Sequence, residues 1–133
     1  MADAEALALL RKEIASLVDR LRRWTPQWWA VEAAPWGSRA DLARHLAQAL
    51  ADAAAVAEGG PPRRLPRLEH DLLVPDQLAV TGDDLVRAEP SGERCRDVVA
   101  HLLLHRFDLL GDDVPVSLGG AAQLERGRTV CER

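Results

Sequence analysis

The sequence DVVAHLLLHRFD, at residues 97–108, carries two of the chain's four histidines on a segment with a helical apolar pattern. His101 and His105 are four residues apart, so on an α-helix both imidazoles lie on one face, about one turn apart, where one metal ion can bind both. At about 100° per residue, Arg94, Asp97 and Asp108 fall in the same stripe, which is roughly 80° wide. Nearly every other residue of this segment is apolar. The segment therefore predicts a helix with one polar face suited to a metal ion.

The composition favours a single intracellular domain over residues 1–133. The chain has 133 residues, a net charge of −4 and arginines mixed among acidic residues, so it lacks the basic face that nucleic acids require. Cys95 and Cys131 match no metal or redox spacing, which favours reduced thiols in a cytoplasm. The charged N-terminus excludes a signal peptide, and no apolar run has the length of a membrane span. A single lysine, Lys12, among many arginines is typical of a high-GC organism such as an actinobacterium.

The apolar periodicity predicts an all-α protein, because no stretch alternates with period two as a half-buried strand does. Short connections favour a four-helix bundle with up-and-down packing, although the Gly/Pro-rich link before the third helix would allow one crossover. Gly82 lies inside that third helix, where glycine is unfavourable. The predicted helices span residues 3–24, 39–57, 75–89 and 93–110, followed by an irregular C-terminal tail.

A third histidine, His45, lies in the second predicted helix, which can face the fourth helix in a bundle. Three protein ligands with one open position are typical of a catalytic metal site. His70, as a fourth ligand, would instead close a tetrahedral structural site. We place His70 below His45, His101 and His105 as a candidate ligand.

Two short stretches resemble a known family. Residues 36–46, WGSRADLARHL, resemble the tryptophan-led second-helix motif of the DinB-like superfamily, whose histidine binds a divalent metal ion. His101 and the His105-Arg106 pair are similar to that superfamily's paired ligands near the end of the fourth helix. Within it, residues 105–111, HRFDLLG, most resemble the mycothiol-dependent maleylpyruvate isomerase branch, although that branch usually has Glu where this chain has His101. The resemblance spans roughly residues 5–111 in element order.

The resemblance implies a DinB-like bundle that binds a divalent ion, with zinc or nickel as the leading candidates, through His45, His101 and His105. It further implies a small-molecule enzyme, a transferase or isomerase with a low-molecular-weight thiol as cosubstrate. In such a site Asp97 and Asp108 could orient the imidazoles through their second nitrogens. The alternative function is a non-catalytic bundle that serves as a binding module or forms a homodimer.

All four tryptophans lie within residues 24–36, around the joint between the first two predicted helices. Clustered tryptophans usually pack a core, so we expect these side chains to close one end of the bundle. Alternatively, Trp28 or Trp36 would line an apolar pocket above the metal ion.

Overall fold

The computed structural model describes residues 3–110, and every regular element in that range is helical. The β-type pairing found there is one isolated bridge between Glu32 and Ser38. The predicted all-α class is therefore confirmed. The elements are α1 (Ala4–Leu21), α2 (Pro26–Trp29), α3 (Arg39–Glu58), the 3-10 helix η1 (Asp71–Leu73), α4 (Val74–Arg87) and α5 (Gly92–Leu110). The predicted C-terminal tail lies outside the described residues.

Helix α1 begins at a capping residue and ends earlier than its apolar pattern suggests. The Asp3 carboxylate accepts hydrogen bonds from two backbone N–H groups of the first turn, at 3.0 and 3.2 Å. The prediction that this helix reaches Trp24 is wrong, because α1 ends at Leu21. Pro26 disfavours a helical backbone at Thr25, which is extended, and it starts the separate helix α2 that the sequence pattern does not reveal.

Helix α3 starts at a capping box and matches the predicted range 39–57 within one residue. The Ser38 hydroxyl accepts from the Asp41 N–H at 3.2 Å, and the Asp41 carboxylate accepts from the Ser38 N–H at 2.9 Å. Gly37 precedes this box with a φ of 107°, and a Cβ at Gly37 would collide with the Asp41 carboxylate. The helix ends at Gly59, whose left-handed backbone (φ 73°) terminates it.

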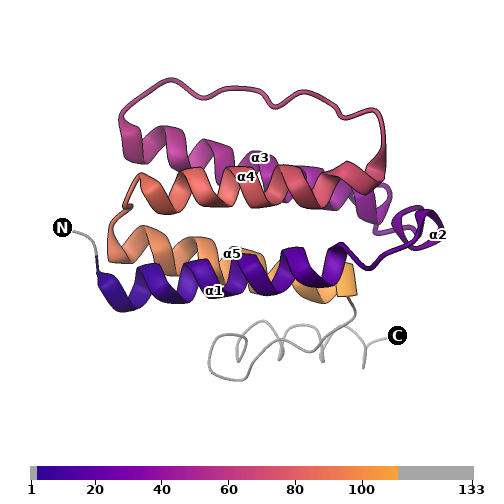
Figure 1. The fold of residues 1–133 in the computed structure, drawn as a ribbon, viewed down its shortest axis with the longest axis horizontal. Helices are drawn as coiled ribbons and strands as arrows, with labels where there is room; N and C mark the ends of the chain where they lie inside the picture. The colour runs from indigo at the N-terminus through magenta and orange to yellow at the C-terminus, as the bar shows by residue number, and fades with distance from the viewer. Residues whose placement is uncertain (1–2, 111–133) are drawn as a thin grey trace.

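The four long helices pack side by side, with one crossover (Figure 1). Helices α1 and α5 run in one direction, whereas α3 and α4 both run in the opposite direction. The favoured up-and-down packing is therefore wrong, and the alternative with a crossover before the third helix is what the structure shows. Residues 59–73 can return along the whole of α3, because an extended chain rises about 3.3 Å per residue and a helix only about 1.5 Å.

Side-chain amide hydrogen bonds hold the crossover against α3. Gln48 donates to the Arg63 carbonyl at 2.8 Å and accepts from the Leu65 N–H at 2.9 Å. The crossover backbone is thereby fixed at mid-helix, where it leads the chain to the start of α4.

Gly82 lies where α4 packs against α1. The residue is buried, and a Cβ there would lie 2.6 Å from Cγ2 of Ile14. Close approach of the two helices therefore explains a glycine inside a helix. Helix α4 forms as predicted but ends at Arg87, two residues before the predicted end.

The hydrophobic core lies between the long helices and extends under α2. Its largest fully buried side chains are Trp29 and a set of leucines from α1, α3, α4 and α5, namely Leu10, Leu21, Leu42, Leu46, Leu50, Leu78, Leu85 and Leu109. Within residues 3–110, none of the helices combines the length and apolar character needed to cross a membrane.

Candidate metal centre

Three partly buried histidines from two helices meet where α3 and α5 face each other. His45 lies on α3, and His101 and His105 lie one turn apart on α5. Their ring centroids are 4.3 Å apart for the α5 pair, and 5.9 and 5.7 Å from His45 to His101 and His105. One ligand nitrogen from each lies within 4.8 Å of the others, and all three residues are partly buried. The structure thus brings together the three histidines predicted as ligands.

This arrangement fits a divalent ion. In a tetrahedral zinc site with Zn–N bonds of about 2.1 Å, ligand nitrogens are about 3.4 Å apart, so small side-chain rotations would bring the three imidazoles onto one ion. The Nε2 atom of His101 is buried and has no hydrogen-bond partner among the described residues. A buried nitrogen without a partner is uncommon and is explained if it binds an ion. The three histidines could therefore hold a metal ion.

The electrostatic environment favours the metal-binding form of His101. Burial, and secondarily the neighbouring His45, lower the pKa of His101 below its ordinary value. A neutral imidazole is the form that binds a metal ion. His101 is therefore in this form at neutral pH.

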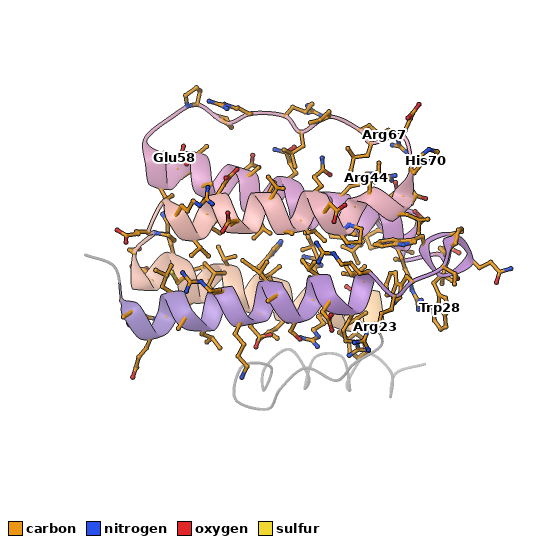
Figure 2. All side chains as sticks on the ribbon, in the orientation of Figure 1. Arg23, Trp28, Arg44, Glu58, Arg67 and His70 are labelled. Carbon is orange, nitrogen blue, oxygen red and sulfur yellow. The ribbon has the colours of Figure 1, made fainter. Side chains whose placement is uncertain are left out.

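Trp36 forms an aromatic wall beside the histidines. Its ring lies 4.3 Å from the His45 ring at an interplanar angle of 31°, and 5.3 Å from the His105 ring in an edge-on arrangement. Of the two tryptophans considered as pocket-lining residues, Trp36 contacts the site, whereas Trp28 is 54% exposed at the α2 corner (Figure 2).

The two predicted orienting carboxylates differ in their positions. The Asp108 carboxylate lies 3.9 Å from Nδ1 of His105, on the next turn of α5. Asp97 is exposed and forms no hydrogen bond or ion pair with another described residue. Asp108 is therefore close to an imidazole of the cluster, although 3.9 Å is too long for a direct hydrogen bond.

His70 lies apart from the cluster. It is exposed at the end of the crossover, where it immediately precedes η1 (Figure 2). Within residues 3–110, the group able to hold a metal ion contains the other three histidines without it.

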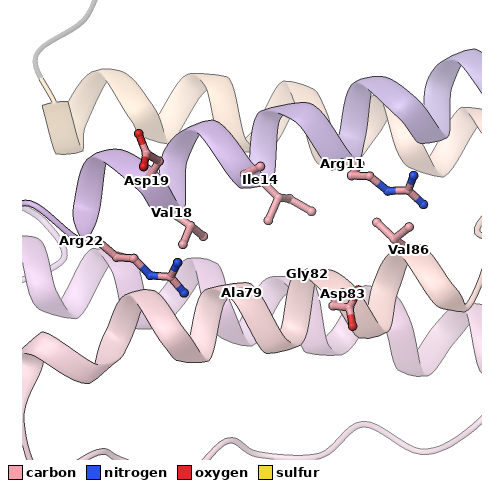
Figure 3. Close-up of a pocket in the computed structure, with 10 residues that line it drawn as sticks. Arg11, Ile14, Val18, Asp19, Arg22, Ala79, Gly82, Asp83 and Val86 are labelled. Atoms are coloured by element: carbon pink, nitrogen blue, oxygen red, sulfur yellow. The ribbon is translucent and has the colours of Figure 1, made fainter.

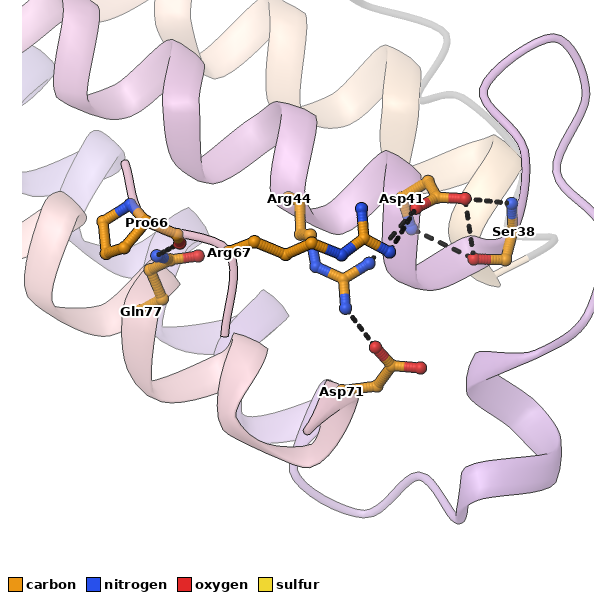
Figure 4. Close-up of polar contacts among 7 residues, drawn as sticks. All are labelled: Ser38, Asp41, Arg44, Pro66, Arg67, Asp71 and Gln77. Carbon is orange, nitrogen blue, oxygen red and sulfur yellow. Dashed lines mark hydrogen bonds and ion pairs between the residues drawn. The ribbon is translucent and has the colours of Figure 1, made fainter. Parts of the chain in front are cut away.

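An arginine that the sequence pattern does not single out anchors the helix that carries His45. Arg44 bonds Asp41 on α3 at 3.1 Å and Asp71 on η1, and its side chain is only 16% exposed (Figure 4). Arg67 of the crossover approaches the same Asp41 carboxylate at 4.0 Å. This network ties the start of α3 to the start of α4. The i, i+3 spacing of Asp41 and Arg44 could have indicated their ion pair from the sequence. The second ion pair, between Arg44 and Asp71, depends on the tertiary fold.

Two arginines of α5 differ in their surroundings. Arg106 contacts Glu13 and Ser16 of α1, both at 3.4 Å. Arg94 is exposed in the first turn of α5.

The remaining tryptophans pack the end of the molecule, as expected from their clustering. Trp29 is fully buried and contacts Trp24 at 4.8 Å between ring centroids. The Arg39 guanidinium lies 5.3 Å from the Trp24 ring and 5.2 Å from the Trp28 ring. Cys95 is buried, and burial raises the pKa of its thiol, so it is suited to packing rather than to nucleophilic attack.

Comparisons with protein-family models, curated proteins and solved structures find no significant match to this chain.

Proposed function

We propose that this protein is a DinB-like four-helix bundle that binds one divalent metal ion through His45, His101 and His105 and acts on a small molecule. The observation that carries the proposal is the meeting of these imidazoles from two helices, with ligand nitrogens within 4.8 Å of one another. Zinc and nickel are the leading candidates, since imidazole suits both. Three protein ligands leave one position open on a four-coordinate ion, as in catalytic sites.

The proposed reaction is a transfer or isomerisation that uses a low-molecular-weight thiol, of which mycothiol is the first candidate. When bound, a divalent ion supplies Lewis-acid chemistry that keeps a thiol in its thiolate form at neutral pH. The chain's own contribution would be positional: the histidines would hold the ion, Trp36 packs beside His45 and His105, and Asp108 would orient His105 if the 3.9 Å separation closed to a hydrogen bond. The thiol rests on the resemblance of residues 36–46 and 105–111 described above.

The alternative proposal is a non-catalytic module that binds a partner. It is favoured by a groove between α1 and α4, whose lining residues come from elements that carry no histidine of the cluster. Metal content separates the two functions, because only the first requires an ion.

The decisive experiment is elemental analysis of untagged protein purified without chelator. We expect about one equivalent of zinc, nickel or another divalent ion, and loss of that ion in His45→Ala, His101→Ala and His105→Ala. His70→Ala is the matched control and should retain the metal, because this histidine is exposed and outside the cluster. Circular dichroism of each variant checks that the helices persist.

The two parts of the proposal fail separately. Protein that stays free of metal after reconstitution with zinc, nickel and cobalt would refute the metal site. If the absorption spectrum of the cobalt-loaded protein does not change when mycothiol is added, the metal site stands and mycothiol is refuted as the cosubstrate.

A further inference from the structure

Two tryptophans and one arginine form a cluster at the corner where α2 leads into α3. The Arg39 guanidinium lies 5.3 Å from the Trp24 ring and 5.2 Å from the Trp28 ring. We call these three residues the Arg39 cluster. Trp28 is 54% exposed, so a small molecule can reach the cluster from solvent on that side (Figure 2).

The charge of Arg39 is not balanced by a carboxylate. Its side chain is partly buried and forms no hydrogen bond or ion pair with another described residue. Asp41, two residues further along α3, is bonded to Ser38 and Arg44. Glu32, which faces Ser38 across the isolated bridge, is exposed and makes no ion pair within the described residues. An indole face attracts the guanidinium charge but supplies no lone pair for its N–H groups.

The groove of about 500 Å³ between α1 and α4 shows the contrast (Figure 3). Arg11 and Arg22 line this groove together with Asp19 and Asp83, so two charges of each sign share it. Arg39 combines partial burial with the lack of such a counter-charge. The Arg39 cluster is therefore the better candidate for recognition of an anion.

Two buried donors beside Trp24 also lack an acceptor. They are Nε of Arg39 and Nε1 of Trp29, neither of which has a hydrogen-bond partner among the described residues. Trp29 is fully buried, and its ring centroid lies 4.8 Å from that of Trp24. Buried donors in folded proteins are normally satisfied. An oxyanion is the acceptor that would complement both the free donors and the positive charge in this region.

We propose that the Arg39 cluster binds a small molecule that carries a carboxylate on an apolar body. A guanidinium binds a carboxylate through two parallel N–H···O hydrogen bonds. The exposed indole of Trp28 supplies an apolar surface on which the body of the ligand packs. The cluster shares no residue with the three histidines, so this site does not depend on a bound metal ion.

Nuclear magnetic resonance of the full, 15N-labelled chain tests this site with sodium benzoate as the probe. The four tryptophans give separate indole N–H signals, which single Trp→Phe variants assign. At constant ionic strength, we expect benzoate to cause saturable shifts of the Trp24 and Trp28 signals. Benzamide, which has a similar shape without the charge, should cause little shift. Arg39→Gln should weaken benzoate binding about tenfold or more, because it removes charge-assisted hydrogen bonds.

Arg23→Gln is the matched control for a general effect of positive charge. Arg23 lies at the same end of the molecule and is 77% exposed, so this variant should bind benzoate like the unmodified chain. Trp28→Ala is a second test that changes an exposed side chain. It should also weaken benzoate binding, measured from the Trp24 signal. Circular dichroism establishes that each variant is folded.

Four results would overturn the proposal. Benzoate binding that is unchanged in Arg39→Gln would exclude the guanidinium as the recognition group. An equal response to benzamide would show that the charge of the ligand plays no part. Tighter binding of inorganic phosphate than of benzoate would exclude a carboxylate as the preferred anion. Shifts confined to Trp36, which contacts His45, would place the ligand at the histidines instead.

Discussion

Trp36 packs against the imidazole of His45. Its indole lies over the His45 ring at 4.3 Å and meets the His105 ring edge-on at 5.3 Å. Because these two histidines come from different helices, one tryptophan side chain restricts ligands from both. Restricting a ligand before binding reduces the conformational entropy lost when a metal ion binds.

We expect Trp36→Ala to weaken divalent metal binding roughly 2- to 12-fold, the range that corresponds to the loss of one aromatic contact of about 0.5–1.5 kcal/mol. Trp36→Phe should recover much of the loss, because it keeps an aromatic face beside His45. Competition with a chromophoric chelator measures the affinities. Trp28→Ala is the matched control, since Trp28 is exposed and packs against Arg39. Equal affinities for Trp36→Ala and the unmodified protein would contradict this role.

At the scale of the element, α3 depends on the polar groups of its first turn. Ser38 and Asp41 satisfy each other's backbone N–H groups, and Arg44 connects the same carboxylate to Asp71 of η1. The hydrogen bond from the Ser38 N–H, followed by the Ser38 hydroxyl and the charges of Arg44 and Arg67, holds the pKa of Asp41 below its ordinary value. Helix α3 therefore starts from an ionised carboxylate.

This lowered pKa gives the direction of a pH dependence. A carboxyl group whose pKa is lowered in the folded protein stabilises the folded state at pH values above the ordinary Asp pKa. This contribution is lost as the pH falls through the pKa that the group has in the folded state. We expect the unfolding free energy of the unmodified protein to exceed that of Asp41→Asn at pH 7. The difference should shrink below about pH 4, as the carboxylate is protonated. Urea denaturation at several pH values measures it, and a difference that stays constant from pH 7 to pH 3 would contradict the assignment.

Ser38→Ala provides a companion variant at neutral pH. Loss of an N-cap side chain costs about 1 kcal/mol, so this variant should lower the unfolding free energy by about that amount at pH 7.

At the scale of the whole molecule, the histidine cluster joins two helices far apart in the sequence. Helix α3 packs mainly on α4, and α5 mainly on α1. A shared ion would therefore cross-link the α3–α4 pair to the α1–α5 pair, and its binding would be coupled to folding.

We expect a bound divalent ion to raise the melting temperature. At a free ion concentration 100 times the dissociation constant, the folded state gains about 2.7 kcal/mol. For a chain of this size that corresponds to a rise of about 10 °C. Differential scanning calorimetry with and without zinc measures the shift. His70→Ala should retain it and His105→Ala should lose it; equal shifts in both variants would place the ion elsewhere.

Much of the local structure was predictable because it depends on neighbouring residues. Apolar spacing indicated α1, α3, α4 and α5, and Ser38 and Asp41 indicated the start of α3. The predicted end of α1 at Trp24 was too late. The helical spacing of apolar residues continues beyond Leu21, where the helix ends before the extended Thr25 and Pro26. Helix α2 is a single turn, too short for a periodic pattern.

The sequence by itself determined the all-α class, the helix starts and the placement of His101 and His105 on one helical face, since these depend on contacts within one or two turns. Only the tertiary structure decided that the chain crosses over before α4, that His45 meets the α5 pair, and that Gly82 packs on Ile14. Those features depend on which side chains fit together between segments tens of residues apart. Neither periodicity nor capping specifies such packing.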